Sequence, residues 1–474
     1  MANKKPFTSA IIGTLVALSI IALVLSLVKV EDVTLPPTVK YGMVFDAGSS
    51  HTSLFVYEWD SDKENDTGVV SQTLSCDVQG PGISSYAYDP PRAGDSLREC
   101  LDKALKVVPA AKQRDVPAYL GATAGMRLLR EQNSSVADQV LAEVTKTMQE
   151  YPVDFKGARI LTGEEEGAYG WITINYLLDS FTKFSPKAHT WLRPEVANIF
   201  GALDLGGAST QISFMPKGSV LNQNEASKFT LYGYNYNIYT HSYLCYGQNE
   251  MLKRLASAPS TRVYHPCYPK GYNETVRLSR RPACLSGDST VTLGGTGAYA
   301  SGCLAAVREL FNFSACGQSR DCTFDGVYQP PLRGQFIAFS AFYYNFKFLN
   351  LTEGQPLATA REAIEQLCTR SWEDVKDPKR LPKYCANANY ILTLLLDAYK
   401  FNETSWKNIF FQMKAGSADV GWTLGYMLNL TNMIPAEAPT RVKGHMPSLW
   451  AAAITFIILT LVLGLTALLL LLWV

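Results

Sequence analysis

The feature that most constrains this chain of 474 residues is a long uncharged apolar run at each end. No residue between Pro6 and Val28 is ionisable, and the run 8–28 is long enough, at about 1.5 Å per helical residue, to cross the hydrocarbon core of a bilayer. The run 449–474 is long enough to cross again. We therefore expect a membrane helix in each run. A cleaved signal peptide at the start and a lipid-anchor signal at the end are the alternatives.

The charges beside the first run give the orientation. Lys4 and Lys5 precede it, whereas Lys29 is balanced by the nearby Glu31 and Asp32, so the positive-inside rule places residues 1–7 in the cytosol. The segment between the helices is then outside. Its N-x-S/T sequons agree with this, because glycans are added only on the lumenal side. The sequon asparagines are Asn65, Asn133, Asn273, Asn312, Asn350, Asn402 and Asn429.

The cysteines point to the same compartment. All 10 lie in the middle segment, and an even number in an oxidising environment predicts five disulfides. No C-x-x-C pair occurs, so a zinc site is not expected. Spacing leaves the pairing open, apart from the short-range pair Cys316 and Cys322.

The charge balance excludes one class of partner. The chain has 43 Lys+Arg and 42 Asp+Glu, a formal net charge of +1, so no excess of positive charge is present to bind nucleic acid. Hydrophobic residues make up 47% of the chain, which excludes disorder.

Two stretches of the middle segment share one pattern, which is an apolar strand, an Asp-x-Gly turn and a second strand. The first covers 41–57 with its turn at 46–50, and the second covers 199–214 with its turn at 204–209. Strands and helices alternate between them, so the pattern predicts a duplicated α/β domain. The cysteine-rich and tyrosine-rich stretch 232–312 has no clear period and is expected to be a disulfide-stapled insertion.

The two turns suggest a phosphate site. Each combines a carboxylate with a glycine that allows close backbone approach and with small hydroxyl residues. One such turn alone is more often an ordinary hairpin, but two turns facing each other would clamp a polyphosphate. Asp46 and Asp204 would repel the anion unless a divalent cation lay between, and Mg²⁺ or Ca²⁺, held largely through water, suits oxygen ligands. No G-x-x-x-x-G-K motif occurs, so the P-loop class is excluded.

Three consecutive glutamates, 164–166, stand before an apolar stretch. Thr162 and Glu165 fit a capping box, so one acid is expected to be structural. Glu166 is the best candidate for a base that activates water, slightly ahead of Glu165. Ser209 has no histidine near it in sequence and no G-x-S-x-G elbow, so it is interpreted as a hydroxyl that positions water rather than as a nucleophile.

Five blocks in this order carry a resemblance over nearly the whole chain: Asp46–Thr52, Ala122–Arg127, Gly163–Gly167, Asp204–Gln211 and Gly421–Asn429. The chain resembles the ecto-nucleoside triphosphate diphosphohydrolases, or ecto-apyrases, within the actin, sugar kinase and heat-shock ATPase superfamily. Two membrane helices and ten cysteines between them resemble the plasma-membrane branch of that family.

The resemblance implies a two-lobed fold of duplicated RNase H-like domains, with lobe I at 38–162 and 412–440 and lobe II at 163–411. It implies hydrolysis of extracellular ATP to ADP and of ADP to AMP at the plasma membrane, with Ca²⁺ or Mg²⁺ as cofactor. A homo-oligomer formed through the membrane helices is compatible with it. Rotation of the lobes is a further hypothesis.

The resemblance also implies roles for individual residues. Glu166 would activate water and Ser209 would help to hold it. Tyr344 and Tyr384 would sandwich the base, although packed aromatics are an equal interpretation. The implied phosphate clamp is Ser49, Ser50, Thr123, Ala124, Gly206, Gly207 and Gln211, with Asp46 and Asp204 ordering the water shell of the metal. The implied disulfides are Cys76–Cys100, Cys245–Cys284, Cys267–Cys303, Cys316–Cys322 and Cys368–Cys385.

Two other functions remain alternatives. A kinase-like or chaperone-like ATPase of the same superfamily would transfer the phosphate or couple hydrolysis to motion. A glycosylated receptor ectodomain would explain the sequons and disulfides without catalysis. Release of free phosphate from both ATP and ADP without an acceptor would distinguish nucleotide hydrolysis from these two alternatives.

Overall fold

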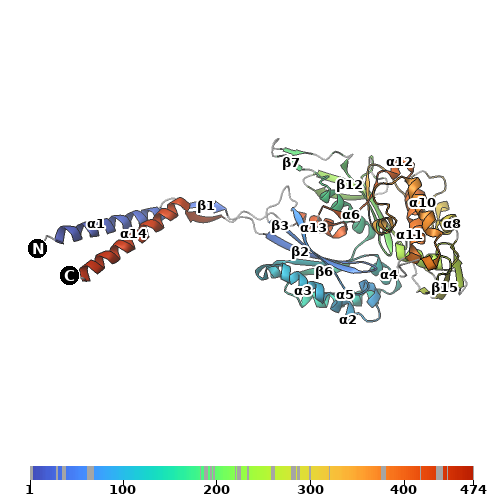
Figure 1. Ribbon diagram of the computed structural model, residues 1–474, viewed down its shortest axis with the longest axis horizontal. Helices are drawn as coiled ribbons and strands as arrows, with labels where there is room; N and C mark the ends of the chain where they lie inside the picture. The colour runs from blue at the N-terminus through green and yellow to red at the C-terminus, as the bar shows by residue number, and fades with distance from the viewer. Residues whose placement is uncertain are drawn as a thin grey trace. The chain divides into compact units, whose positions relative to one another are not determined.

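Figure 1 shows the computed structural model of the chain as a ribbon. The chain divides into two compact units, which we describe separately: the two ends, Met1–Thr38 with Glu437–Val474, and the larger unit, Val39–Ala436. The structure describes residues 4–27, 30–34, 39–60, 69–181, 183–185, 190–192, 195, 198–218, 220, 226–231, 234–257, 262–278, 284–285, 289–297, 300–319, 321–374, 381–416, 418–433, 441–445 and 447–472. The sequon at Asn65 lies outside these residues.

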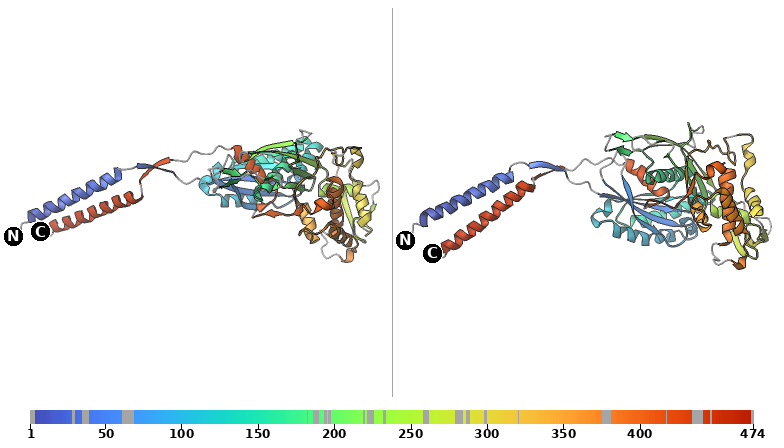
Figure 2. Two further views of the ribbon diagram at one scale, coloured as in Figure 1. Left: turned by 90° about the horizontal axis from the view of Figure 1, so that it is seen from above. Right: turned by 45° about the horizontal axis from the view of Figure 1, so that its top comes forward.

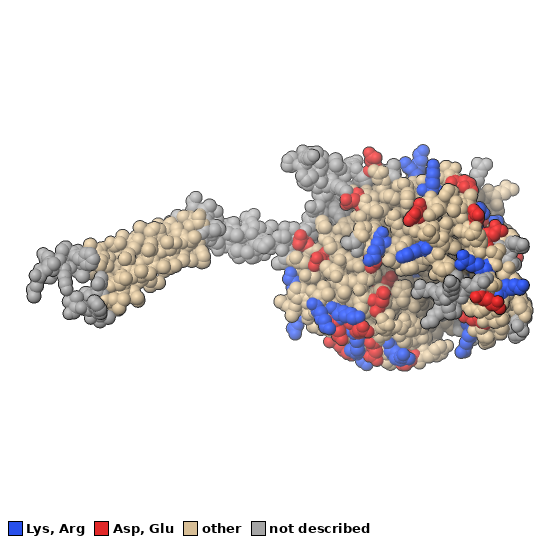
Figure 3. All heavy atoms as spheres, in the orientation of Figure 1, with Lys and Arg blue, Asp and Glu red and all other residues tan. Residues whose placement is uncertain are grey.

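The unit formed by the chain ends consists of two helices and a strand pair. Helices α1 (Lys4–Leu27) and α14 (Pro447–Leu472) contain the stretches Ala10–Leu27 and Ser448–Leu469, which are long and apolar enough to cross a membrane. The two helices lie side by side, with the chain termini at the same end of the pair (Figures 1 and 2). Their described surface carries no charged side chain in Figure 3. Next to them, β1 (Val30–Thr34) pairs antiparallel with β20 (Arg441–His445).

The larger unit contains two main sheets. The first has the strand order β4-β3-β2-β5-β6, in which β3 is antiparallel to its neighbours and β2, β5 and β6 are parallel. The expected strand–turn–strand over 41–57 is confirmed, but β2 continues through Asp46, which pairs with Ser53 and lies in the strand rather than in the turn. The strands are β2 (Val39–Ala47), β3 (Thr52–Asp60), β4 (Val70–Asp77), β5 (Pro117–Ala122) and β6 (Asp154–Ile160).

The second sheet repeats the first. Its order is β11-β12-β10-β9-β16-β17, with β10 antiparallel to β9 and β12, and with β9, β16 and β17 parallel. The duplicated α/β architecture is therefore confirmed. Strand β12 falls within 232–312, so this stretch is not wholly an insertion, because part of it completes the sheet. The strands are β9 (Gly201–Leu205), β10 (Ser209–Phe214), β11 (Ala226–Leu231), β12 (Tyr234–Leu244), β16 (Phe336–Ser340) and β17 (Ile409–Phe411).

Helices α6 (Gly163–Leu177) and α13 (Trp422–Met433) pack between the two sheets. The core between the sheets includes Val44 of β2, Trp171 of α6 and Ile337 of β16. The alternate residues Met43 and Phe45 face the other side of the first sheet. This alternation is typical of strands buried on both faces. The exact limits of the two lobes remain a prediction.

The remaining elements cover the outer faces of the sheets or form small additions. The helices are α2 (Pro91–Ser96), α3 (Arg98–Val107), α4 (Ala124–Gln132), α5 (Ser134–Gln149), α7 (Gln248–Ala256), α8 (Ala300–Arg308), α9 (Ala341–Phe348), α10 (Leu357–Cys368), α11 (Leu381–Thr393) and α12 (Glu403–Trp406). The strands are β7 (Lys183–Ser185), β8 (Thr190–Leu192), β13 (Arg262–His265), β14 (Asn273–Leu278), β15 (Ser289–Gly295), β18 (Lys414–Ala415) and β19 (Ala418–Asp419).

All ten cysteines are paired in the larger unit. The disulfides are Cys76–Cys100, Cys245–Cys284, Cys267–Cys303, Cys316–Cys322 and Cys368–Cys385. These are the pairs that the resemblance implies. Four of the five lie in the part of the chain after β12.

Candidate active site

The two Asp-x-Gly turns touch each other at the ends of equivalent strands. A Cβ atom at Gly207 would lie within 2.5 Å of the hydroxyl oxygens of both Ser49 and Ser50, so a larger residue would displace these side chains. Asn249, at the start of α7, donates a hydrogen bond from Nδ2 to Oγ of Ser50 at 2.9 Å. The sequence suggests two facing turns, and the structure brings them into direct contact.

A third loop packs against both turns, and its Ala124 shares a small apolar cluster with Ala208 of the second turn. The backbone N–H of Thr123 donates to the carbonyl of Ala47 at 3.1 Å. A Cβ on Gly125 would lie 2.8 Å from Cα of Ser49, so this loop is packed against the first turn. Helix α4 begins here at Ala124, and the N-terminus of a helix favours an anion. Three short loops from two sheets thus converge where a phosphate chain would be bound.

The three glutamates at the start of α6 are divided by the helix cap. Thr162 accepts the N–H of Glu165 at 3.1 Å, and the Glu165 carboxylate accepts the N–H of Thr162 at 3.0 Å, which completes the predicted capping box. The Glu165 carboxylate also pairs with Arg159 at 2.7 Å. Glu166 points inward instead, and its side chain is only 8% exposed. The two candidates for the base are therefore separated, because Glu165 is engaged in the cap.

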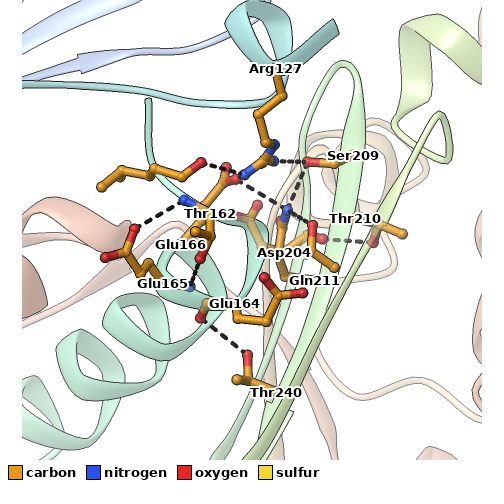
Figure 4. A network of polar contacts seen from close by, with 12 residues as sticks. Arg127, Thr162, Glu164, Glu165, Glu166, Asp204, Ser209, Thr210, Gln211 and Thr240 are labelled. Atoms are coloured by element: carbon orange, nitrogen blue, oxygen red, sulfur yellow. Dashed lines mark hydrogen bonds and ion pairs between the residues drawn. The ribbon is translucent and has the colours of Figure 1, made fainter. Parts of the chain in front are cut away.

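Glu166 belongs to a polar network with Ser209 and Gln211 (Figure 4). Nη2 of Arg127 donates to the Glu166 carboxylate at 2.8 Å and to Oγ of Ser209 at 3.0 Å. Nε2 of Gln211 donates to the same two groups at 3.2 and 2.7 Å, and to Oγ of Ser242 at 2.9 Å. Oε1 of Gln211 is buried and has no hydrogen-bond partner among the described residues. With two donors on its oxygen, the Ser209 hydroxyl is free to donate its own proton.

Three acids share this space, and each holds its proton more tightly than usual. Burial raises the pKa of Glu166, and the neighbouring Arg127 partly offsets the effect. Burial, followed by the charge of Glu166, raises the pKa of Asp46 to about 8 and that of Asp204 to about 7. At neutral pH these carboxyl groups thus need a positive charge to ionise together.

The two aspartates fit a divalent cation. Oδ1 of Asp46 and Oδ1 of Asp204 are shielded from solvent and have no hydrogen-bond partner among the described residues. Within the described part of the chain, no three His, Cys, Asp or Glu side chains are placed to hold a metal directly. Two carboxylates with unused oxygens suit a hard cation that retains several of its waters.

The two tyrosines proposed for the base have different surroundings. Phe348 stacks on Tyr384 with ring centroids 3.8 Å apart and an interplanar angle of 3°. Tyr344 lies one turn before Phe348 on α9, is 55% exposed, and its hydroxyl is 3.1 Å from Sδ of Met413. The sandwich remains a prediction, and Phe348 occupies one face of Tyr384.

Sequence reasoning did not select Arg127, Ser242 or Asn249. Arg127 ends the block Ala122–Arg127, so a search for a counter-charge to Glu166 would have found it. Ser242 pairs with Gln211 in the β10–β12 register, and this relation is visible only once the strand pairing is known. Asn249 reaches the site because α7 begins beside Gly207, and no spacing in the sequence indicates that.

Comparisons with known proteins identify the family of the chain. The model of the GDA1/CD39 (nucleoside phosphatase) family matches residues 32–443. Ectonucleoside triphosphate diphosphohydrolase 8 of Gallus gallus is 54% identical, with 99% of each chain covered, and that of Homo sapiens is 48% identical, with 98% of this chain and 97% of the other covered. Ectonucleoside triphosphate diphosphohydrolase 2 of Mus musculus is 48% identical over 97% of this chain and 95% of its own. The segment Tyr239–Cys245 likewise suggests type eight.

A solved structure shares the fold. The crystal structure of nucleoside triphosphate hydrolases from Neospora caninum superposes with a TM-score of 0.58, covering 84% of this chain and 93% of that chain at 14% identity. At this identity the likeness bears on the fold alone. It supports the two-sheet architecture described above.

Proposed function

The chain belongs to the GDA1/CD39 family of nucleoside phosphatases, and on this premise we propose that it hydrolyses the terminal phosphate of nucleoside tri- and diphosphates outside the cell. The observation that carries the proposal is the place of Glu166. Its buried carboxylate stands beside Ser209 and Gln211, next to the two turns that contact each other. This is the arrangement needed to bind a phosphate chain and to activate one water molecule against it.

The proposed reaction is an in-line attack of water on the terminal phosphorus. Glu166 accepts the proton of the water, while Ser209 and Oε1 of Gln211 orient the molecule. The bond between phosphorus and the bridging oxygen breaks, so inorganic phosphate and the shortened nucleotide leave without a phosphoenzyme. N–H and hydroxyl groups of the loops around Ser49, Ser50, Thr123, Ala124, Gly206 and Gly207 hold the phosphate oxygens and stabilise their charge.

The same clamp accounts for two substrates. It grips the terminal phosphates and makes no demand on the number of phosphates behind them. ADP shifted by one position would therefore fit where ATP fits, and the expected sequence of products is ATP, ADP and AMP. Tyr344 and Tyr384 remain the proposed base contacts, and Phe348 would have to leave the face of Tyr384 that it covers before the base could stack there.

The proposed cofactor is Ca²⁺ or Mg²⁺. When bound, it would neutralise phosphate charge, with Asp46 and Asp204 holding its water shell. The protein's own part is to keep these two carboxylates close to each other and to Glu166, at a separation where their charges interact.

The proposed location is the plasma membrane, with the larger unit outside. The chain is anchored by two apolar helices that lie antiparallel, so both termini are on one side of the membrane. The lysines before α1 favour the cytosol for that side, and the sequons favour the exterior for the other. A homo-oligomer through α1 and α14 is a further proposal, which crosslinking in intact membranes would test.

The test of the proposed function is phosphate release from ATP and from ADP by the full-length protein. Glu166→Gln keeps the size of the side chain and an oxygen for Arg127 but removes the base, so we expect turnover to fall by about 10²–10⁴-fold with surface delivery retained. The matched control is Glu165→Gln, since glutamine also completes a capping box. Equal loss in both variants, or release that requires an added acceptor, would contradict the proposal.

A further inference from the structure

A cavity of about 300 Å³ lies outside the proposed active site, and none of its lining residues belongs to the phosphate or base contacts. Its wall includes Pro330, Pro331, Gln329, Lys400, Asn402 and Ser405. Asn402 begins the sequon Asn-Glu-Thr over 402–404. A candidate modification site therefore opens directly onto an otherwise unassigned cavity.

The local structure of Asn402 is compatible with a glycan. Its Oδ1 caps helix α12 by accepting the N–H groups of Thr404 and Ser405, both at 3.0 Å, and Oγ of Ser405 accepts the backbone N–H of Asn402 at 2.8 Å. An N-linked sugar is attached through Nδ2, so the cap and the glycan use different atoms of the same amide. The cap also fixes the side chain that the sugar would extend.

The wall of the cavity has the chemistry of a sugar site. Pro330 and Pro331 offer an apolar surface of the kind that the C–H face of a pyranose covers. Gln329 is 5% exposed, and its Oε1 has no hydrogen-bond partner among the described residues, while its Nε2 donates to the carbonyl of Tyr399 at 3.0 Å. Ser405 and Lys400 add polar groups for hydroxyl or acetamido oxygens. An apolar wall with a few polar groups is typical of a small-ligand pocket.

We propose that this cavity seats the first N-acetylhexosamine of a glycan on Asn402, so that the sugar becomes part of the folded structure. The inference rests on the proposed placement of the larger unit outside the cell, where glycans are added. The seated sugar joins the segment 329–332 to the start of α12 and stabilises both against unfolding. The sequon at Asn133 is a contrast, because that residue caps α5 in the same way but does not line the cavity.

The first test compares two substitutions at one exposed position in the full-length protein made by glycosylating cells. Thr404→Ala destroys the sequon, whereas Thr404→Ser keeps it. We expect Thr404→Ala to lower Tm by about 2–4 °C relative to Thr404→Ser, although alanine is the better helix former. Ser135→Ala removes the Asn133 sequon and should leave Tm unchanged. Mass spectrometry of glycopeptides establishes the occupancy of each site.

A second measurement reports burial of the sugar itself. Peptide N-glycosidase cleaves the bond between Asn and the innermost sugar, so on the native protein it should release the Asn133 glycan much faster than the Asn402 glycan. After denaturation the two rates should be equal. Pro331→Glu should lower Tm when it is combined with Thr404→Ser, which keeps the glycan, but not when it is combined with Thr404→Ala, which removes it. The reason is that Pro331 acts on the seated sugar.

The result that overturns the inference is an unglycosylated Asn402, equal native release at Asn133 and Asn402, or equal Tm for the two Thr404 variants. A Pro331→Glu effect that persists without the sequon would show that Pro331 stabilises the protein independently of the sugar and would also overturn the inference. Hydrolysis of ATP that depends on Glu166 is measured separately. If the glycan is not seated but hydrolysis is retained, only the inference fails. If the glycan is seated but hydrolysis is absent, only the proposed function fails.

Discussion

At the scale of single residues, the proposed function rests on how consecutive glutamates are separated by the first turn of α6. Glu165 turns outward to the cap and to Arg159, and Glu166 turns inward to Arg127. The cap therefore does more than begin the helix, because it also fixes which acid enters the site. A buried carboxylate with one cationic partner is a poised base, since its pKa depends strongly on that partner.

Arg127 is expected to set the pH range of the reaction. Its charge lowers the pKa of Glu166 against the effect of burial, so Arg127→Ala should raise that pKa further. The acidic limb of the kcat/KM profile then moves to higher pH, and at a fixed pH on that limb the activity falls about tenfold for each pH unit that the limb moves. Arg127→Lys keeps the charge and should restore part of the range.

The control for this prediction lies one turn further along α4. Arg130 is exposed and pairs with Asp138 at 3.1 Å, away from Glu166. Arg130→Ala should leave the pH profile unchanged. An unshifted acidic limb in Arg127→Ala would show that Glu166 is not the group whose ionisation controls the rate.

The raised pKa values of Asp46 and Asp204 predict how stability depends on pH. An aspartate in the unfolded chain has a pKa near 3.8, but in the folded protein Asp46 titrates at about 8 and Asp204 at about 7. Between the unfolded and folded values the folded state therefore binds more protons than the unfolded state. Without a divalent cation the protein should lose stability as pH rises from about 4 to about 8. Added Ca²⁺ or Mg²⁺ should raise Tm more at pH 8 than at pH 5.

Asp204→Asn tests whether this group is responsible. The variant cannot ionise at this position, so the metal-free protein should lose less Tm with rising pH and should gain less from the cation. Asp138→Asn, on the surface of α5, serves as the control. A cation effect of equal size at pH 5 and pH 8 in the unaltered protein would contradict the assignment of these two acids to the cation.

At the scale of elements, the contact between α6 and α13 connects the two sheets. Gly425 of α13 approaches α6 so closely that an added Cβ would overlap the carbonyl of Tyr169, and its N–H donates to Oγ1 of Thr173 at 2.8 Å. Gly425→Ala should force the helices apart and destabilise the protein by about 1–3 kcal/mol. Turnover should also fall, because α6 carries Glu166 in its first turn.

Gly421 provides the control for Gly425→Ala. Gly421 precedes α13, and a Cβ there would meet no atom within 4 Å. Gly421→Ala should leave thermal stability unchanged or raise it slightly. Thermal melts and phosphate release are measured for the two purified variants. If Gly425→Ala changes neither Tm nor turnover, the close contact between α6 and α13 is not required for stability or activity.

The same elements show how far the sequence determines the fold. The two Asp-x-Gly units could be predicted because alternating strands and glycine turns are local signals. The limits of β2 could not, since Asp46 is drawn into the strand by pairing with Ser53 and by the neighbouring strand β5. Strand β12 was not recognised in its tyrosine-rich stretch. It forms a hairpin with β11, which directly precedes it, but its place in the main sheet depends on pairing with the more distant β10. Long-range pairing leaves little trace in a local pattern.

The whole molecule joins two independent compact units, and the chemistry resides in one of them. All five disulfides, both main sheets and every proposed site residue lie within Val39–Ala436. The other unit contains the two apolar helices and the β1–β20 pair. Acidic and basic side chains are interspersed on the face of the larger unit shown in Figure 3, as expected for a surface in contact with water.

This division predicts that residues 39–436, secreted without either membrane helix, fold and hydrolyse nucleotides. The reason is that the cores on both faces of each sheet are made of residues inside these limits, so removal of the ends exposes no part of them. We expect release of phosphate from both ATP and ADP, abolished by Glu166→Gln in the same truncated chain. A secreted protein with five intact disulfides but no turnover would show instead that the paired ends hold the larger unit in its active form.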